Sequence, residues 1–261
     1  IIMCEHATEL RKRGIGTTAL GMGQGFDDGL LSGIAEAGGG SYVYIESASQ
    51  LARTFEHELD RLTATTATRL NLRLQLPEGL RGALLNPFPV ERQGRRFDIA
   101  VDDLVAGDEV VLIFEITSRN ARLGDQLSVD LSLRWTDPTT GDRRTEHTSV
   151  DALEVVDERF YATLPAERDV AAQTAILRAS EGQRRAMELD RAGRYVESRA
   201  MHTAAFDVLA AAPLLAEDSH LLDEARTYAA FDANMAFSEH DRKQATFDSF
   251  NRSRRRKVAS E

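Results

Sequence analysis

The chain has 261 residues, of which 42% are hydrophobic and 28% charged, and its formal net charge at pH 7 is −10. This composition is typical of an ordinary folded protein and argues against a disordered chain. The acidic balance predicts repulsion from nucleic acids and anionic membranes, and no apolar run approaches the roughly 20 residues of a membrane-spanning helix.

The first segment, to about Leu62, alternates helices and strands. Residues 5–13 are polar and helix-favouring, and Gly14 stands where a glycine commonly ends a helix. The short apolar run Ile15–Met22 is typical of a buried parallel strand. Strands alternating with helices indicate a parallel α/β sheet, which needs more strands than this segment supplies. We therefore predict that the strand at 15–22 exposes a pairing edge that a neighbouring strand would normally cover.

Two further helices and a strand are expected in the same segment. Asp27 or Asp28 can cap a helix that the glycines at 38–40 end. The run at 42–45 is strongly strand-forming. A helix then follows with an apolar stripe at helical spacing, formed by Leu51, Phe55, Leu59 and Leu62.

Several stretches between residues 14 and 59 carry a family resemblance: Gly14–Gly23, Phe26–Leu31, Ile34–Gly40, Tyr42–Ile45 and Leu51–Leu59. Together they resemble the last strand–helix–strand–helix of bacterial von Willebrand factor A domains. In that family a metal ion is held by an Asp-x-Ser-x-Ser loop after the first strand, together with a Thr and an Asp from later loops. The resemblance implies that these groups would lie upstream of Ile1, so that this chain is truncated and holds no such metal.

The second segment, residues 63–158, changes to a period of two. Leucines alternate with polar residues over 70–76, and apolar residues alternate with polar ones over 127–135. Further strands are expected at 97–101 and 110–116. Short strands at this spacing predict an antiparallel β-sandwich. The series at 102–110 looks like the sandwich that follows the A domain in relatives described as calcium-activated chloride-channel-like or inter-alpha-trypsin-inhibitor-heavy-chain-like.

The third segment, residues 159–261, is expected to be helical. The stretch 167–215 is rich in helix-forming residues, and its spacing resembles one tetratricopeptide-like hairpin, although such repeats need about three copies to stand alone. We expect a helical hairpin packed on the sandwich, then a segment at 221–238 and a basic tail. The basic run Arg252–Lys257 is interpreted as a solvated tail, and binding of phosphate or nucleic acid is the alternative.

A glycine-rich loop after the first strand is the candidate partner-binding site. Gly21, Gly23 and Gly25 do not match a dinucleotide fingerprint, because Phe26 stands where that pattern continues. Two interpretations stay open: the glycines simply permit a turn, or the loop lies on the rim where A domains bind ligands. In the second case the partner-binding residues are Gln24, Phe26 and Asp27.

The remaining chemistry-bearing residues give no catalytic pattern. Asp130-Leu131-Ser132 is close to the A-domain metal loop but lies in the middle of an expected strand, so we assign no metal to it. The histidines are scattered, and Cys4 with His6 offers only two ligands. A single cysteine excludes an internal disulfide, and we expect a cytoplasmic location.

The sequence thus predicts a multidomain α+β chain. The expected domains are a C-terminal part of a von Willebrand factor A domain at 1–62, a β-sandwich at 63–158 and a helical region with a basic tail at 159–261. The expected function is non-catalytic protein–protein interaction without a metal site, a cofactor or a membrane span. The alternative is a C-terminal structural or regulatory remnant of a longer enzyme- or channel-associated protein that depends on its missing half.

Overall fold

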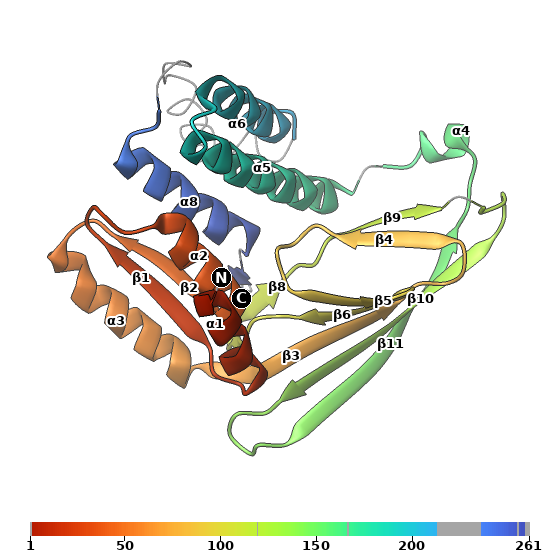
Figure 1. Ribbon diagram of the computed structural model, residues 1–261. Coiled ribbons are helices and arrows are strands. Elements are labelled where there is room, and N and C mark those ends of the chain that lie inside the picture. The colour runs from red at the N-terminus through yellow and green to blue at the C-terminus, as the bar shows by residue number, and fades with distance from the viewer. Residues whose placement is uncertain (1, 119, 166, 213–235, 255, 259–261) are drawn as a thin grey trace.

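The computed structural model describes residues 2–118, 120–165, 167–212, 236–254 and 256–258. Figure 1 shows a small α/β part beside a long twisted antiparallel sheet, with three helices stacked above them. Within the described part of the chain, no helix is both long enough and apolar enough to cross a lipid bilayer.

The α/β part has the element order expected for it. It consists of α1 (Ile2–Lys12), β1 (Thr17–Met22), α2 (Asp28–Gly38), β2 (Gly39–Ile45) and α3 (Ala48–Thr63). The strands β1 and β2 pair in parallel, as predicted. Between them, the side chain of Asp27 caps α2, and Gly39 ends that helix in the left-handed conformation. Among the described residues β1 has no strand partner on its other edge, which confirms the predicted open edge.

A mainly antiparallel sheet forms the second part. Its strand order is β11-β10-β3-β6-β5, and β7 pairs with the start of β3. The bounds are β3 (Thr65–Gln75), β5 (Val90–Gln93), β6 (Arg96–Ala100), β7 (Leu104–Val105), β10 (Gln126–Thr136) and β11 (Arg143–Glu154). The expected alternation holds in β3, where Leu70 and Leu74 are buried, and in β10, where Val129 is buried and Asp130 is exposed.

Two shorter strand pairs accompany this sheet. They are β4 (Leu80–Leu84) with β9 (Phe114–Ser118), and β8 (Asp108–Val110) with β12 (Arg256–Val258). The β4–β9 pair packs on the main sheet, because the ring of Phe114 meets that of Phe97 edge-on with centroids 6.2 Å apart. The apolar cluster between them includes Leu76, Leu80 and Ile99.

The prediction of one strand over 110–116 was wrong. The chain leaves β8 after Val110 and starts β9 only at Phe114. The cause is the buried side chain of Asn86, which accepts a hydrogen bond from the backbone N–H of Ile113 at 2.8 Å and donates one to the carbonyl of Val111 at 3.0 Å. These two hydrogen bonds satisfy backbone groups at the bend that have no strand partner there. The chain can therefore pass from the β8–β12 pair to the β4–β9 pair.

The helices are α4 (Glu158–Tyr161), α5 (Arg168–Arg191), α6 (Tyr195–Ala210) and α8 (Glu239–Ser253). The expected hairpin of α5 and α6 is present, turned by Gly193 at a positive φ of 74°. Its main further partner is α8, and α5 meets the β4–β9 pair through the ion pair Arg178–Glu115 at 3.5 Å. Most of the segment expected at 221–238 lies outside the described residues.

Candidate functional site

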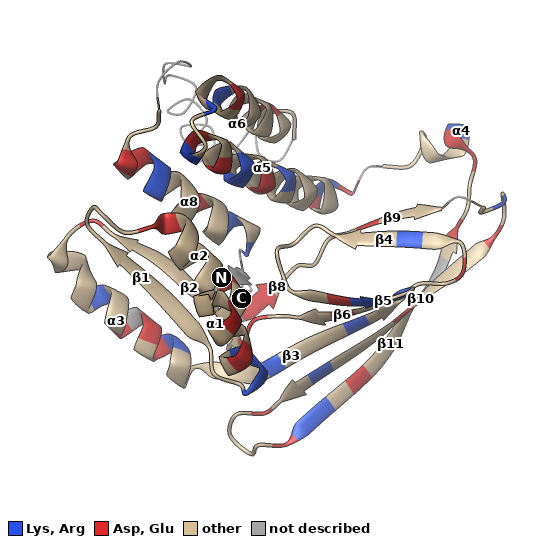
Figure 2. Ribbon diagram, in the orientation of Figure 1, with Lys and Arg blue, Asp and Glu red and all other residues tan. Residues whose placement is uncertain are grey.

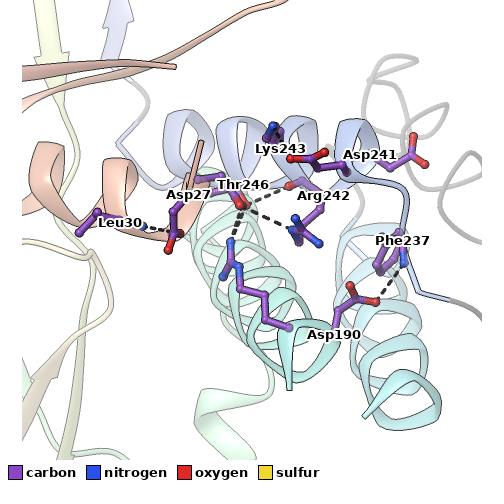
Figure 3. A network of polar contacts seen from close by, with 12 residues as sticks. Asp27, Leu30, Asp190, Phe237, Asp241, Arg242, Lys243 and Thr246 are labelled. Carbon is purple, nitrogen blue, oxygen red and sulfur yellow. Dashed lines mark hydrogen bonds and ion pairs between the residues drawn. The ribbon is translucent and has the colours of Figure 1, made fainter. Parts of the chain in front are cut away.

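The helix α8 joins the α/β part to the hairpin through a buried carboxylate. Asp28, at the start of α2, is only 2% exposed. Its carboxylate accepts a hydrogen bond from Thr246 at 2.7 Å and pairs with the guanidinium of Arg191, while Nε of Arg242 lies 3.6 Å away (Figure 3). Burial by itself raises the pKa of Asp28, but these donors and positive charges outweigh it and lower the pKa below its ordinary value. The cluster ties α2, α5 and α8 together.

A second contact holds the glycine-rich loop against α8. Lys243 has a fully buried side chain, and its Nζ donates to the carbonyl of Gly23 at 3.3 Å and to Glu239 at 2.9 Å. Glu239 also accepts from the backbone N–H of Gly25 at 3.1 Å. The ammonium lies 4.1 Å from the centroid of the Phe26 ring. A buried ammonium is thus satisfied by a carboxylate, a carbonyl and a ring face, and the loop is fixed in place.

The three predicted partner-binding residues lie in this loop but differ in their contacts. Phe26 packs on Tyr44 at 5.9 Å and fills the space above Gly21, where a side chain would collide with its ring. Asp27 accepts from the backbone N–H of Leu30 at 2.9 Å as the cap of α2. Gln24 is exposed. Phe26 and Asp27 therefore have structural roles within the chain, and partner binding by the three stays a prediction.

The other end of α8 leads into a third buried cluster, which contradicts the interpretation of the basic run as a solvated tail. Arg254 is 6% exposed at its side chain and pairs with Asp102 at 2.9 Å, and Arg11 approaches the other oxygen at 3.2 Å. The guanidinium of Arg254 lies 4.9 Å from the ring of Phe250 and 5.4 Å from that of Phe88. The carboxylate of Asp102 and the rings of Phe250 and Phe88 thus stabilise this arginine in a buried position.

Two further residues of the basic run, Arg256 and Lys257, lie in a short strand pair. Residues 256–258 pair as β12 with the acidic strand β8, with Lys257 opposite Glu109. Figure 2 shows the two signs of charge interleaved along α5 as well. Binding of phosphate or nucleic acid by the basic run stays a prediction.

The structure places the remaining candidate groups apart from one another. Asp130 and Ser132 lie in mid-strand in β10, as expected, opposite Gln75 and Arg73 of β3. Among the described residues, no three His, Cys, Asp or Glu side chains converge as metal ligands. His202 is 2% exposed, and burial, with smaller contributions from neighbouring arginines, lowers its pKa to about 4, so it is neutral near pH 7.

An apolar surface flanks the open edge of β1. On α3 the stripe residues Phe55, Leu59 and Leu62 are 51%, 60% and 73% exposed, and Met22 at the end of β1 is 55% exposed. Figure 1 shows α3 on one side of the β1–β2 pair and α1 and α2 on the other. We call the open edge of β1 together with the stripe of α3 the edge surface. Sequence reasoning found the edge and the stripe, but not that the stripe is left exposed.

The contacts of α3 with the strands beneath it are polar. Glu58 accepts a hydrogen bond from Thr18 at 3.1 Å, and Arg61 donates to Ser41 at 3.5 Å. A hollow of about 410 Å³ lies on the β2 side of this helix, lined in part by Arg53, Thr54, Tyr42, Phe247 and Asn251. The apolar stripe is therefore not the side of α3 that contacts β1 and β2.

Comparisons with known proteins support the fold. No family model matches the chain. It is 26% identical over 156 residues to an uncharacterized protein of Synechocystis sp., a match that covers 52% of this chain and 37% of the relative. Similar solved structures include a von Willebrand factor type A protein from Catenulispora acidiphila, with a TM-score of 0.64 at 15% identity, covering 92% of this chain and 60% of that one.

Two other solved structures extend over a similar share of the chain. The ArnB paralog VWA2 from Sulfolobus acidocaldarius has a TM-score of 0.52 at 13% identity and covers 94% of this chain and 57% of its own. Human COPII-coat protein Sec24c has a TM-score of 0.55 at 14% identity and covers 94% of this chain and 33% of its own. The chain thus spans less than two thirds of each of these proteins. Its mixed α/β fold is that of von Willebrand factor A-like proteins.

Proposed function

We propose that this chain is a non-catalytic protein-interaction module that works without a metal site of its own. The proposal rests on the edge surface, which combines the exposed apolar side chains of α3 with the unpaired backbone of β1. Apolar patches of this kind on soluble proteins mark interaction sites, and open strand edges accept further strands. The likeness in fold to von Willebrand factor A-like proteins supports an interaction or adhesion role.

The state of the buried charged groups supports the absence of catalysis. Three buried charged groups, Asp28, Asp102 and Lys243, are each paired with an oppositely charged side chain. A general acid or base needs a free proton position directed at a substrate, whereas these groups hold helices together. We propose a structural role for all three.

A second candidate function is favoured by the lengths of similar proteins. The chain spans 37% of its Synechocystis relative and 60% of the Catenulispora structure. It would then be the C-terminal structural or regulatory part of a longer von Willebrand factor A-type protein. In that arrangement the antiparallel sheet and the β4–β9 pair would act as the predicted β-sandwich that orients the α/β part. Gln24, which is exposed in the glycine-rich loop, would be available to a partner.

Site-specific photo-crosslinking tests the interaction role. A photoreactive phenylalanine analogue is placed at Leu59, and in a matched variant at Val196, which is 62% exposed on α6 and lies outside the edge surface. We expect discrete protein adducts from position 59 in cells that produce the chain, and none from position 196. Equal labelling at both positions, or none at either, would contradict the proposal.

A further inference from the structure

We infer that a cleft between the α5–α6 hairpin and α2 binds a small organic cation, an ammonium group on an apolar body, whose charge pairs with the carboxylate of Glu36. The residues that line this cleft are not those of the edge surface, so the inference goes beyond the proposed function. It follows from the size and lining of the cleft, from the pairing of its charged side chains and from the surroundings of Glu36.

The cleft has a volume of about 1000 Å³ and lies between the hairpin, α2 and the segment that joins β4 to β5 (Figure 1). Its apolar lining comes from two directions, with Leu85 and Pro87 in the segment after β4 and Met201 and Val208 on α6. Pockets for small molecules have volumes of roughly 300–1000 Å³ and combine apolar walls with a few polar groups. The cleft therefore has the size and the walls of a small-molecule site.

The charged side chains that line the cleft show which sign of charge is left over. Three of them are arginines of α5, and each pairs with a glutamate: Arg178 with Glu115 at 3.5 Å, Arg184 with Glu188 at 2.6 Å and Arg185 with Glu181 at 2.7 Å. The remaining charged residue of the lining is Glu36 on α2. The positive charges of the cleft are thus matched within the chain, and one carboxylate remains.

The surroundings of Glu36 do not supply a partner for this carboxylate. Within the described part of the chain, no side chain or N–H donates a hydrogen bond to it. Arg11 and Arg254 approach the residue, but they donate to its backbone carbonyl, at 3.2 Å and 3.5 Å. Burial raises the pKa of Glu36 above its ordinary value, although Arg254 and Arg184 act in the opposite direction. A bound ammonium group would supply both the missing donor and the missing charge.

A second polar group without a partner lies next to this carboxylate. A hollow of about 50 Å³ between α2, α5 and α8 adjoins the cleft, since Glu36, Leu85 and Pro87 line both. Ser180 lines this hollow and is 2% exposed, and its hydroxyl has no hydrogen-bond partner among the described residues. A buried hydroxyl in this state gains from a water molecule or a ligand group beside it. The polar end of the ligand is therefore expected at Glu36, and its apolar body toward α6.

Titrations followed by proton–nitrogen NMR of the whole chain test the inference. The probe is phenethylammonium, with phenethyl alcohol as its neutral analogue and phenylpropanoate as its anionic one. We expect phenethylammonium to shift the amide signals of residues 33–37 and of α6. It should bind at least about tenfold more tightly than the alcohol, because it adds a charge-assisted hydrogen bond. Glu36→Gln should reduce its affinity to that of the alcohol.

Three controls separate binding from folding. The carboxylate of Glu36 has no hydrogen bond to lose, so Glu36→Gln should melt at the same temperature as the parent. Ala204→Trp places a large ring in the cleft from α6, and it should weaken binding of the ammonium and of the alcohol alike. Glu197→Gln removes an exposed carboxylate from the same helix outside the lining, and it should leave both affinities unchanged.

The opposite results overturn the inference in identifiable ways. If the ammonium binds no more tightly than the alcohol, or keeps its affinity in Glu36→Gln, Glu36 is not the partner of the ligand. Tightest binding of phenylpropanoate would mean that the arginines of α5 receive an anion. Tighter binding of acetyl-lysinamide than of phenethylammonium would assign the cleft to a lysine side chain of a protein. Crosslinking from position 59 is independent of these titrations, so the proposed function is judged separately.

Discussion

Thr246 in α8 donates a 2.7 Å hydrogen bond to the carboxylate of Asp28, a residue 218 positions earlier in the chain. The same helix is attached to the α/β part by Lys243, which donates to the carbonyl of Gly23, and by the rings of Phe247 and Phe250, which pack against Tyr42. Because these contacts are buried, their loss should be measurable as a loss of stability of the whole chain.

Asp28→Asn should strongly destabilise the protein. The substitution removes the negative charge and leaves Arg191 and Arg242 facing a neutral group, and breaking a buried pair in this way costs about 3 kcal/mol or more. Urea unfolding measures the difference in the free energy of unfolding. Glu197→Ala removes an exposed pair with Arg194 and serves as the control, with no measurable change expected in the free energy of unfolding. A similar loss in both variants would contradict the structural role of Asp28.

The same variant should alter the dependence of stability on acid. The folded-state pKa of Asp28 lies below its unfolded value near about 3.9, so its contribution is present above that pH and is lost as the pH falls through the folded-state value. The free energy of unfolding, compared at about pH 5 and about pH 3, should fall less in the Asp28→Asn protein than in the parent. An equal fall would mean that the carboxylate is not held in its ionised form.

His202 should destabilise the protein in mild acid. Its pKa is lowered to about 4, whereas an unfolded histidine titrates near about 6.5, so the unfolded chain binds more protons between these values. The contribution of His202 to the free energy of unfolding is therefore fully present above the unfolded-state pKa. It is lost as the pH falls toward the folded-state pKa. In His202→Phe, which keeps a ring against Phe206, this part of the fall should disappear between about pH 7 and about pH 5. Identical slopes for the two proteins would refute the assignment.

Asn86→Ala should cost about 2 kcal/mol, because it leaves the N–H of Ile113 and the carbonyl of Val111 without their partner at a buried bend. Chemical denaturation gives the value. Asn71→Ala is the matched control, since its amide accepts a hydrogen bond from the exposed Arg134. A loss no larger than in the control would mean that water replaces the Asn86 amide without cost.

Divalent metal should leave thermal stability unchanged. A ligand that binds only the folded state raises the unfolding midpoint, so circular dichroism with and without millimolar Mg²⁺ or Mn²⁺ detects any site. We expect coincident melting curves, and a chelator should not shift them either. A clear rise would locate a metal on the chain, and Asp130 with Ser132 would be the first residues to substitute.

The sequence predicted the local structure of the chain well where one periodicity dominates. Alternation over 127–135 marked β10, and Asp27 or Asp28 with the glycines at 38–40 marked the ends of α2, because strand faces and helix caps depend on neighbouring residues. The single strand expected over 110–116 failed for a nonlocal reason. Asn86 binds the backbone there from 25 and 27 residues away, and no pattern within the strand reveals that contact.

The buried clusters of charged side chains could not be predicted from the sequence for a similar reason. Arg254 stands in a run of basic residues, and its partner Asp102 is 152 residues away. A run of like charges normally predicts solvation, and only the fold brings an acid and two rings to it. Residues 159–261 were expected to be helical, but no separate helix was predicted at 239–253, because this stretch is mostly polar. Phe247 and Phe250, three positions apart, were a usable signal of one buried face.

The packing of Phe250 on Tyr42, with ring centroids 6.0 Å apart, also constrains how the protein is made. The core of the first α/β elements includes a side chain that the ribosome adds about 200 residues after Tyr42. Until α8 emerges, β1, β2 and α2 lack one of their covers, and contacts of such long sequence separation form slowly. The nascent chain therefore exposes apolar surface until α8 has been synthesised, so its yield should depend on chaperones that bind early.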